Sequence, residues 1–102
     1  SRGDTSIVYK YLLQFQELIP PRIESLEESL KVGDRKKTRQ LLHQMSPQLQ
    51  FFGIKDIVQP IRRLELEYET MPFEDLSSLV NNILMKLHIA IKDVAFVLEE
   101  NF

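Results

Sequence analysis

The sequence of 102 residues contains no cysteine, which excludes disulfide bonds, thiolate metal sites and cysteine nucleophiles. Its two histidines form neither a His-x-x-x-His nor a Glu-x-x-His pair, so a histidine-rich metal site is not expected. With only three glycines, the sequence also lacks a glycine-rich phosphate loop. These absences remove the common sequence support for metal and nucleotide chemistry.

Neither charge of one sign nor long apolar runs dominate the sequence. The formal net charge is -2, whereas a general nucleic-acid-binding domain would carry a strong basic excess. No stretch reaches the roughly 18 consecutive apolar residues that a membrane span needs, and the N-terminus lacks a secretory pattern. We therefore expect no nucleic-acid partner, no membrane contact by this domain and a cytoplasmic location, which is compatible with a membrane-anchored parent protein.

Helical periodicity extends over almost the whole sequence. Apolar residues recur at helical spacing in five segments, and the few glycines and lack of β-branched runs disfavour a sheet. The predicted segments are residues 5–19, 21–30, 34–52, 54–68 and 73–100. Short connections between successive helices make them antiparallel neighbours. The sequence thus predicts an all-α fold, an antiparallel up-down four-helix bundle with a short additional N-terminal helix.

Prolines and glycines set the predicted boundaries. Pro20 and Pro21 are expected to interrupt or bend the chain, because neither can donate a backbone hydrogen bond. Gly33 suits a left-handed helix cap, and Asp34 suits the N-cap of the next helix, which Gly53 ends. We interpret residues 1–4 as a linker or cloning remnant and residues 5–102 as a single helical domain.

His43 is the most informative residue of the sequence. In a helix that turns about 100° per residue, Leu41, Met45 and Phe52 lie on one face. The opposite face, within roughly 60° of His43, carries no large apolar side chain. It consists of Lys36, Arg39, Gln40, Ser46, Pro47 and Gln50. His43 is therefore expected to face solvent, where a partner can reach it.

An accessible imidazole is a potential nucleophile. It titrates at about pH 6.5, so near neutrality it keeps a nitrogen lone pair that can accept a phosphoryl group and release it again. Lys36 and Arg39 would attract an anionic partner, and Phe51, about 80° from His43, would border an exposed docking patch. Composition alone leaves the plainer interpretation open, an incidental surface histidine on a solvated basic face.

Other polar residues receive structural interpretations. His88 lies beside Leu84 and Ile91 at the edge of the apolar seam of the last segment, so a partly buried packing role is expected. The acidic residues of the fourth segment are expected to form solvated surface. These are Glu65, Glu67 and Glu69.

The order of the segments resembles that of the histidine phosphotransfer domains of bacterial multistep phosphorelays. The resemblance covers almost the whole chain: an N-terminal helix, a Gly-Asp restart, the histidine helix, a further helix and a long final helix. His43 matches the family's histidine, and Gly53 matches the glycine that follows ten residues later. Ser46 and Pro47 depart from the family pattern, which commonly has lysine at the third position after the histidine and glycine at the fourth.

The resemblance implies a phosphocarrier without an ATP site or autonomous kinase activity. His43 would take a phosphoryl group from the phospho-aspartate of a response-regulator receiver domain and pass it to another receiver. The chain would need no cofactor of its own, because the receiver binds the Mg²⁺, and a hybrid histidine kinase in the same chain is a further implied partner. The predicted supporting or docking residues are Lys36, Arg39, Gln40, Ser46, Pro47, Gln50, Phe51 and Gly53.

Two other classes of function stay open at the level of sequence. Since Ser46 replaces the usual lysine, the chain could be a degenerate module of this kind, which binds a receiver or another partner without phosphotransfer. A structural or dimerising helical segment of a larger protein is the third class. The dimeric helical hairpin of histidine kinases is disfavoured, because its histidine is normally followed by an acidic residue and here Gln44 follows.

Overall fold

The structure is a computed structural model that describes residues 2–54 and 56–102, with the backbone alone at residues 2–4. The described residues form four α-helices and no strand: α1 (Arg2–Lys31), α2 (Arg35–Phe51), α3 (Val58–Glu67) and α4 (Phe73–Asn101). The predicted all-α class is confirmed. The linker predicted for residues 1–4 begins outside the described residues, and α1 starts at Arg2.

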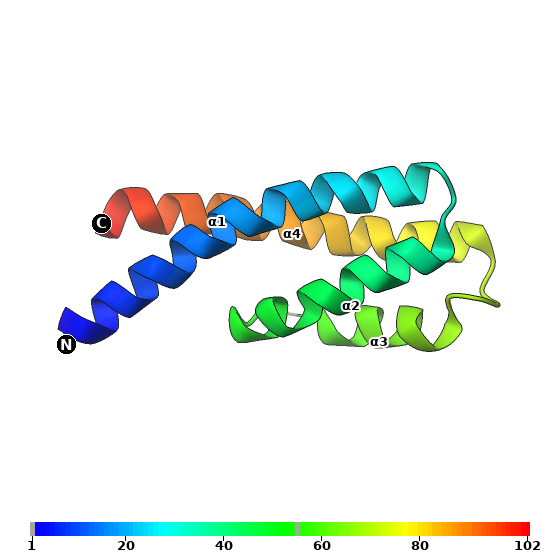
Figure 1. The fold of residues 1–102 in the computed structure, drawn as a ribbon, viewed down its shortest axis with the longest axis horizontal. Helices are drawn as coiled ribbons and strands as arrows, with labels where there is room; N and C mark the ends of the chain where they lie inside the picture. The colour runs from blue at the N-terminus through cyan, green and yellow to red at the C-terminus, as the bar shows by residue number, and fades with distance from the viewer. Residues whose placement is uncertain (1, 55) are drawn as a thin grey trace.

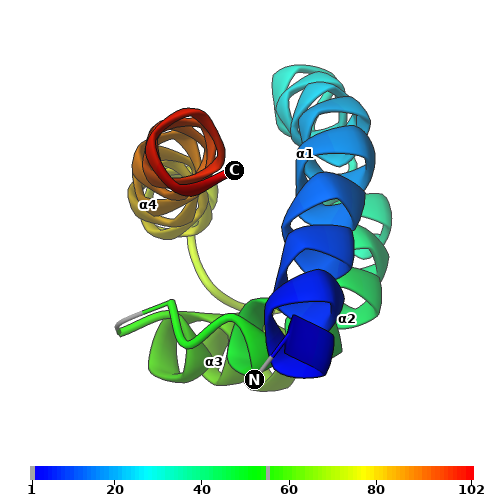
Figure 2. The same cartoon turned by 90° about the vertical axis from the view of Figure 1, so that its left-hand side faces the viewer.

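The four helices pack in a ring, in which α1 and α3 each contact both α2 and α4. The molecule measures 49 × 21 × 17 Å, and α1 and α4 lie side by side along its long axis (Figure 1). Figure 2 shows the four helices end on, around a shared centre. Buried apolar side chains from all four fill this centre, among them Phe15, Ile19, Leu26, Leu42, Met45, Leu49, Ile61, Leu64, Leu76, Val80, Ile83 and Leu87.

The separate N-terminal helix predicted for residues 5–19 is wrong, because α1 continues through Pro20 and Pro21. One buried stripe, Phe15, Ile19 and Ile23, runs past both prolines at helical spacing. Each proline leaves a carbonyl of the preceding turn without its helical donor, but those carbonyls belong to exposed residues, where water can reach them. Burial of the stripe against α2 and α4 therefore outweighs the local preference for a break.

The boundaries of α2 agree with the prediction. Gly33 has φ +74°, and the Asp34 side chain accepts a hydrogen bond of 2.9 Å from the Lys37 backbone N–H at the helix start. Gly53, with φ +65°, follows the last turn of α2. Both glycines occupy the left-handed region that residues with a Cβ rarely adopt, so they fix where the chain leaves one helix for the next.

Two polar contacts fix α2 against its neighbours. The buried hydroxyls of Ser29 on α1 and Thr38 on α2 are 2.8 Å apart and share a hydrogen bond. At the start of α2, Arg35 donates to the backbone carbonyls of Tyr68 and Met71, which lie between α3 and α4. The helix that carries His43 is thus held on both sides.

The expected partial burial of His88 on α4 is wrong, because this side chain is exposed. Leu84 and Leu87 are buried next to it. At about 100° per residue, His88 lies outside the narrow stripe that these residues present to the core. None of the helices in the described part of the chain has an apolar stretch long enough to cross a membrane.

Candidate functional site

His43 lies halfway along α2, on the side away from the core. Its side chain is 63% exposed, whereas the neighbouring Leu42 and Met45 are fully buried and anchor the helix. This arrangement follows from the helical repeat, which turns the apolar residues inward and leaves the imidazole outside. A partner of protein size can therefore approach the ring.

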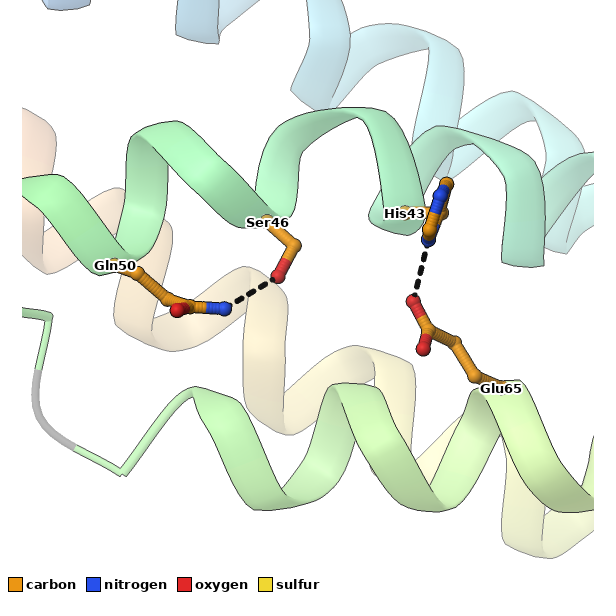
Figure 3. A network of polar contacts seen from close by, with 4 residues as sticks. All are labelled: His43, Ser46, Gln50 and Glu65. Carbon is orange, nitrogen blue, oxygen red and sulfur yellow. Dashed lines mark hydrogen bonds and ion pairs between the residues drawn. The ribbon is translucent and has the colours of Figure 1, made fainter.

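Glu65 of α3 orients the imidazole. Its Oε1 lies 2.9 Å from His43 Nδ1, and the two side chains point toward one another across the space between the helices (Figure 3). An ionised carboxylate has no hydrogen to give, so Nδ1–H is the donor. In the neutral ring the lone pair then resides on Nε2, which becomes the nucleophilic nitrogen.

The pairing of α2 with α3 places His43 at the edge of a hollow of about 290 Å³. The hollow is lined by His43, Ser46, Pro47 and Gln50 of α2 and by Val58, Arg62 and Glu65 of α3. The two helices run in opposite directions along the hollow, so each further turn of α2 faces the preceding turn of α3. Side chains from two distant parts of the sequence thus meet around the imidazole.

Ser46 presents a hydroxyl to this hollow one turn after His43. The Gln50 side-chain amide donates to Ser46 Oγ at 3.0 Å, and both side chains lie on the side of α2 that faces α3 (Figure 3). Because Ser46 Oγ accepts this bond, its own hydrogen is left for another acceptor. Position 46 therefore presents an oriented hydroxyl group to the hollow.

The two basic residues predicted to support His43 lie outside the hollow. Lys36 is exposed two turns before His43. The Arg39 guanidinium lies 5.8 Å from the centre of the Tyr68 ring, a cation–π contact that holds it at the α2–α3 interface. The basic residue that does line the hollow is Arg62, which the sequence analysis did not select.

The other predicted residues divide into two groups. Pro47 and Gln50 line the hollow, while Gln40 is exposed on the same helix and Gly53 forms the turn after α2. Phe51 is 66% exposed and contacts the Tyr11 ring at 5.1 Å between centroids. An exposed aromatic pair therefore lies near the end of α2, two helical turns after His43.

Glu65 is the functional candidate that sequence reasoning missed, since it was expected to be solvated surface. The carboxylate is only 27% exposed and is bonded to His43, 22 residues away in the sequence. Ile54, in the connection between α2 and α3, is the midpoint of this pair. Ser46 and Arg62 are spaced symmetrically about the same midpoint. If the two helices on either side of the connection are assumed to be antiparallel, this symmetry places Glu65 opposite His43 and Arg62 opposite Ser46. That assumption was the signal that would have identified Glu65 and Arg62.

Among the described residues, no group of three or more acidic or histidine side chains is placed to hold a metal ion. Comparison of the chain with protein-family models, curated proteins and solved structures finds no match. Functional assignment therefore depends on the geometry around His43.

Proposed function

We propose that this chain is a histidine phosphotransfer domain, an up-down four-helix bundle in which His43 carries a phosphoryl group between receiver domains. The observation that carries the proposal is the exposed imidazole bonded through Nδ1 to Glu65 at 2.9 Å. That bond leaves Nε2 as the free nucleophile on a ring that is 63% exposed. The resemblance of the segment order to this family supports the same assignment.

The transfer would use the His43–Glu65 pair directly. The Nε2 lone pair attacks the phosphorus of an aspartyl phosphate on the receiver; the N–P bond forms as the acyl phosphate P–O bond breaks, and the aspartate carboxylate leaves. The attacking ring becomes cationic, and the carboxylate that accepts its Nδ1–H stabilises that charge. Attack by the aspartate of a second receiver reverses these steps, and each receiver supplies its own Mg²⁺.

The surface around the imidazole suits a protein partner. Pro47 and Gln50 are exposed around the hollow, and Phe51, the residue after Gln50, adds a large exposed apolar side chain at the end of α2. Exposed aromatic residues beside polar ones are typical of interaction surfaces. A receiver seated here would cover the hollow and exclude water from the transferring phosphoryl group.

Transfer from isolated receivers tests this proposal. Every receiver domain encoded in the genome that encodes this chain would be labelled with [³²P]acetyl phosphate and Mg²⁺, then mixed with wild-type protein or His43→Ala. We expect acid-labile label on the wild type from at least one receiver and none on His43→Ala. His88→Ala is the matched control, since His88 is also exposed but lies on α4, outside the hollow.

Two outcomes contradict the proposal. One is a wild type that no receiver labels; the other is label that persists in His43→Ala. Receiver binding that His43→Ala does not weaken, without any phosphohistidine, would assign the chain to a binding module instead.

A further inference from the structure

We infer that Arg62 of α3 binds the phosphoryl group on His43, together with the Ser46 hydroxyl. This inference rests on the proposed function. His43 and Ser46 of α2 and Arg62 and Glu65 of α3 all line the hollow between the two helices. The arginine thus supplies, from the opposite helix, the positive charge that α2 does not place beside the imidazole.

The charges around the imidazole require such a residue. A phosphoryl group on Nε2 brings about two negative charges to a ring whose other nitrogen is already bonded to the Glu65 carboxylate. The Glu65 carboxylate balances the positive charge of a ring that keeps its Nδ1–H, so the charge of the phosphoryl group itself still needs a cation beside it. Arg62 precedes Glu65 by one helical turn on α3 and lines the same hollow, so its guanidinium offsets the added charge.

Arg62 is also the arginine of α2 and α3 that has no other role in the described structure. Arg35 bonds to two backbone carbonyls, Arg39 stacks on Tyr68, and Arg63 pairs with Glu67 at 3.5 Å. Within the described part of the chain, Arg62 has neither a hydrogen-bond partner nor an ion-pair partner. An exposed guanidinium with five unused donors can bind two phosphoryl oxygens at once.

Ser46 completes the arrangement. Its oxygen accepts from Gln50, so its hydrogen is available to a phosphoryl oxygen on the side of the hollow that faces α3. A neutral hydroxyl orients such an oxygen without supplying charge. Ser46 of α2 therefore supplies a hydroxyl donor, and Arg62 of α3 supplies the positive charge.

Phosphoramidate is the probe for this inference, because it needs no receiver. The Nε2 lone pair attacks its phosphorus, the N–P bond to His43 forms, and the bond to the amine breaks to release ammonia. Arg62→Gln is expected to slow this labelling about fivefold, the size of effect typical of a lost charge-assisted contact at an exposed site. The neighbouring Arg63→Gln, whose side chain lies outside the hollow, is the matched control and should leave the rate unchanged.

Two further measurements separate phosphoryl binding from a structural effect. The difference between wild type and Arg62→Gln should shrink as salt rises, because screening weakens exposed charges. Ser46→Lys introduced into Arg62→Gln should restore the rate of His43 labelling, because it places a cation in the same hollow from the α2 side.

The outcomes distinguish this inference from the function on which it rests. If wild type accepts no phosphoryl group from phosphoramidate or from any receiver, the proposed function fails. If wild type is labelled on His43 but Arg62→Gln and Arg63→Gln react equally fast, the role of Arg62 alone is overturned. A slower Arg62→Gln that is insensitive to salt and not rescued by Ser46→Lys also overturns it.

Discussion

The hydrogen bond between His43 and Glu65 joins two helices, yet it contributes little to folding. The imidazole is 63% exposed, and exposed pairs of this kind stabilise proteins by about 0–1 kcal/mol. Its value is orientation: it fixes which nitrogen carries the hydrogen and holds the ring at the edge of the hollow. A contact of small energy can thus decide the chemistry of the site.

Removal of the Glu65 carboxylate should reveal this orienting role. We expect Glu65→Ala to slow labelling of His43 by phosphoramidate about tenfold, in line with the loss of a group that orients a reacting histidine. The fraction of neutral imidazole with hydrogen on Nδ1, measured by ¹⁵N NMR, should fall at the same time. Glu67→Ala is the control, since Glu67 pairs with Arg63. Equal rates for the two variants would show that the carboxylate does not act on the imidazole.

At the scale of residues, the sequence predicted the exposure of His43 but not its partner. Exposure depends on the local helical repeat, which is readable from residues within two turns. The Glu65 contact depends on the register of α3 against α2, and that register is set by the connection after Gly53 and by core packing. Arg62 was missed for the same reason, because its importance comes from the residue that it faces.

At the scale of elements, α1 shows a local rule overridden by packing. Pro21 is exposed inside the helix, and its ring occupies the position of the N–H that would bond to the Glu17 carbonyl. From the two prolines alone, a break in the helix was therefore the reasonable prediction. Continuity came from the buried stripe on the opposite side of the helix, whose partners in α2 and α4 are not visible in the sequence of α1.

Because Pro21 removes a backbone donor inside α1, we expect this helix to be less stable than its packing allows. Pro21→Ala restores a backbone donor in the helix interior, so it should raise the free energy of unfolding by about 2 kcal/mol, after allowance for the greater freedom of the unfolded chain. Urea titrations followed by circular dichroism would measure the gain.

Pro60→Ala provides the comparison, because Pro60 lies in the first turn of α3, where a backbone N–H has no helical acceptor. No gain is expected there. An equal gain at both positions would show that the gain does not come from the interrupted hydrogen bond of α1, because the greater freedom of the unfolded chain can only lower stability.

At the scale of the whole molecule, the core and the site occupy different places. The core is built from buried side chains of all four helices, whereas the hollow is lined by residues of α2 and α3 alone. Apolar periodicity in the sequence was sufficient to predict the all-α class, and Gly33, Asp34 and Gly53 were sufficient to predict the boundaries of α2. It could not predict the ring of contacts, which depends on how all four stripes meet.

Unfolding measurements should separate these two regions. His43→Ala and Glu65→Ala are expected to change the free energy of unfolding by less than about 0.5 kcal/mol, as exposed substitutions do. Thr38→Val, which deletes one hydroxyl of the buried Ser29–Thr38 bond, should cost about 1 kcal/mol. A loss of 1 kcal/mol or more from His43→Ala would contradict the separation, on the scale at which roughly 1 kcal/mol marks a structural contact.

If His43 carries a phosphoryl group as proposed, its exposed position has a consequence for how that group acts. The group would change the charge of one face, whereas the core residues Leu42 and Met45 lie on the other side of the same helix. The phosphorylated and free forms would then share one backbone and one melting temperature. A molecule of this kind would transmit information only through what its modified face attracts or repels, and not through a change of fold.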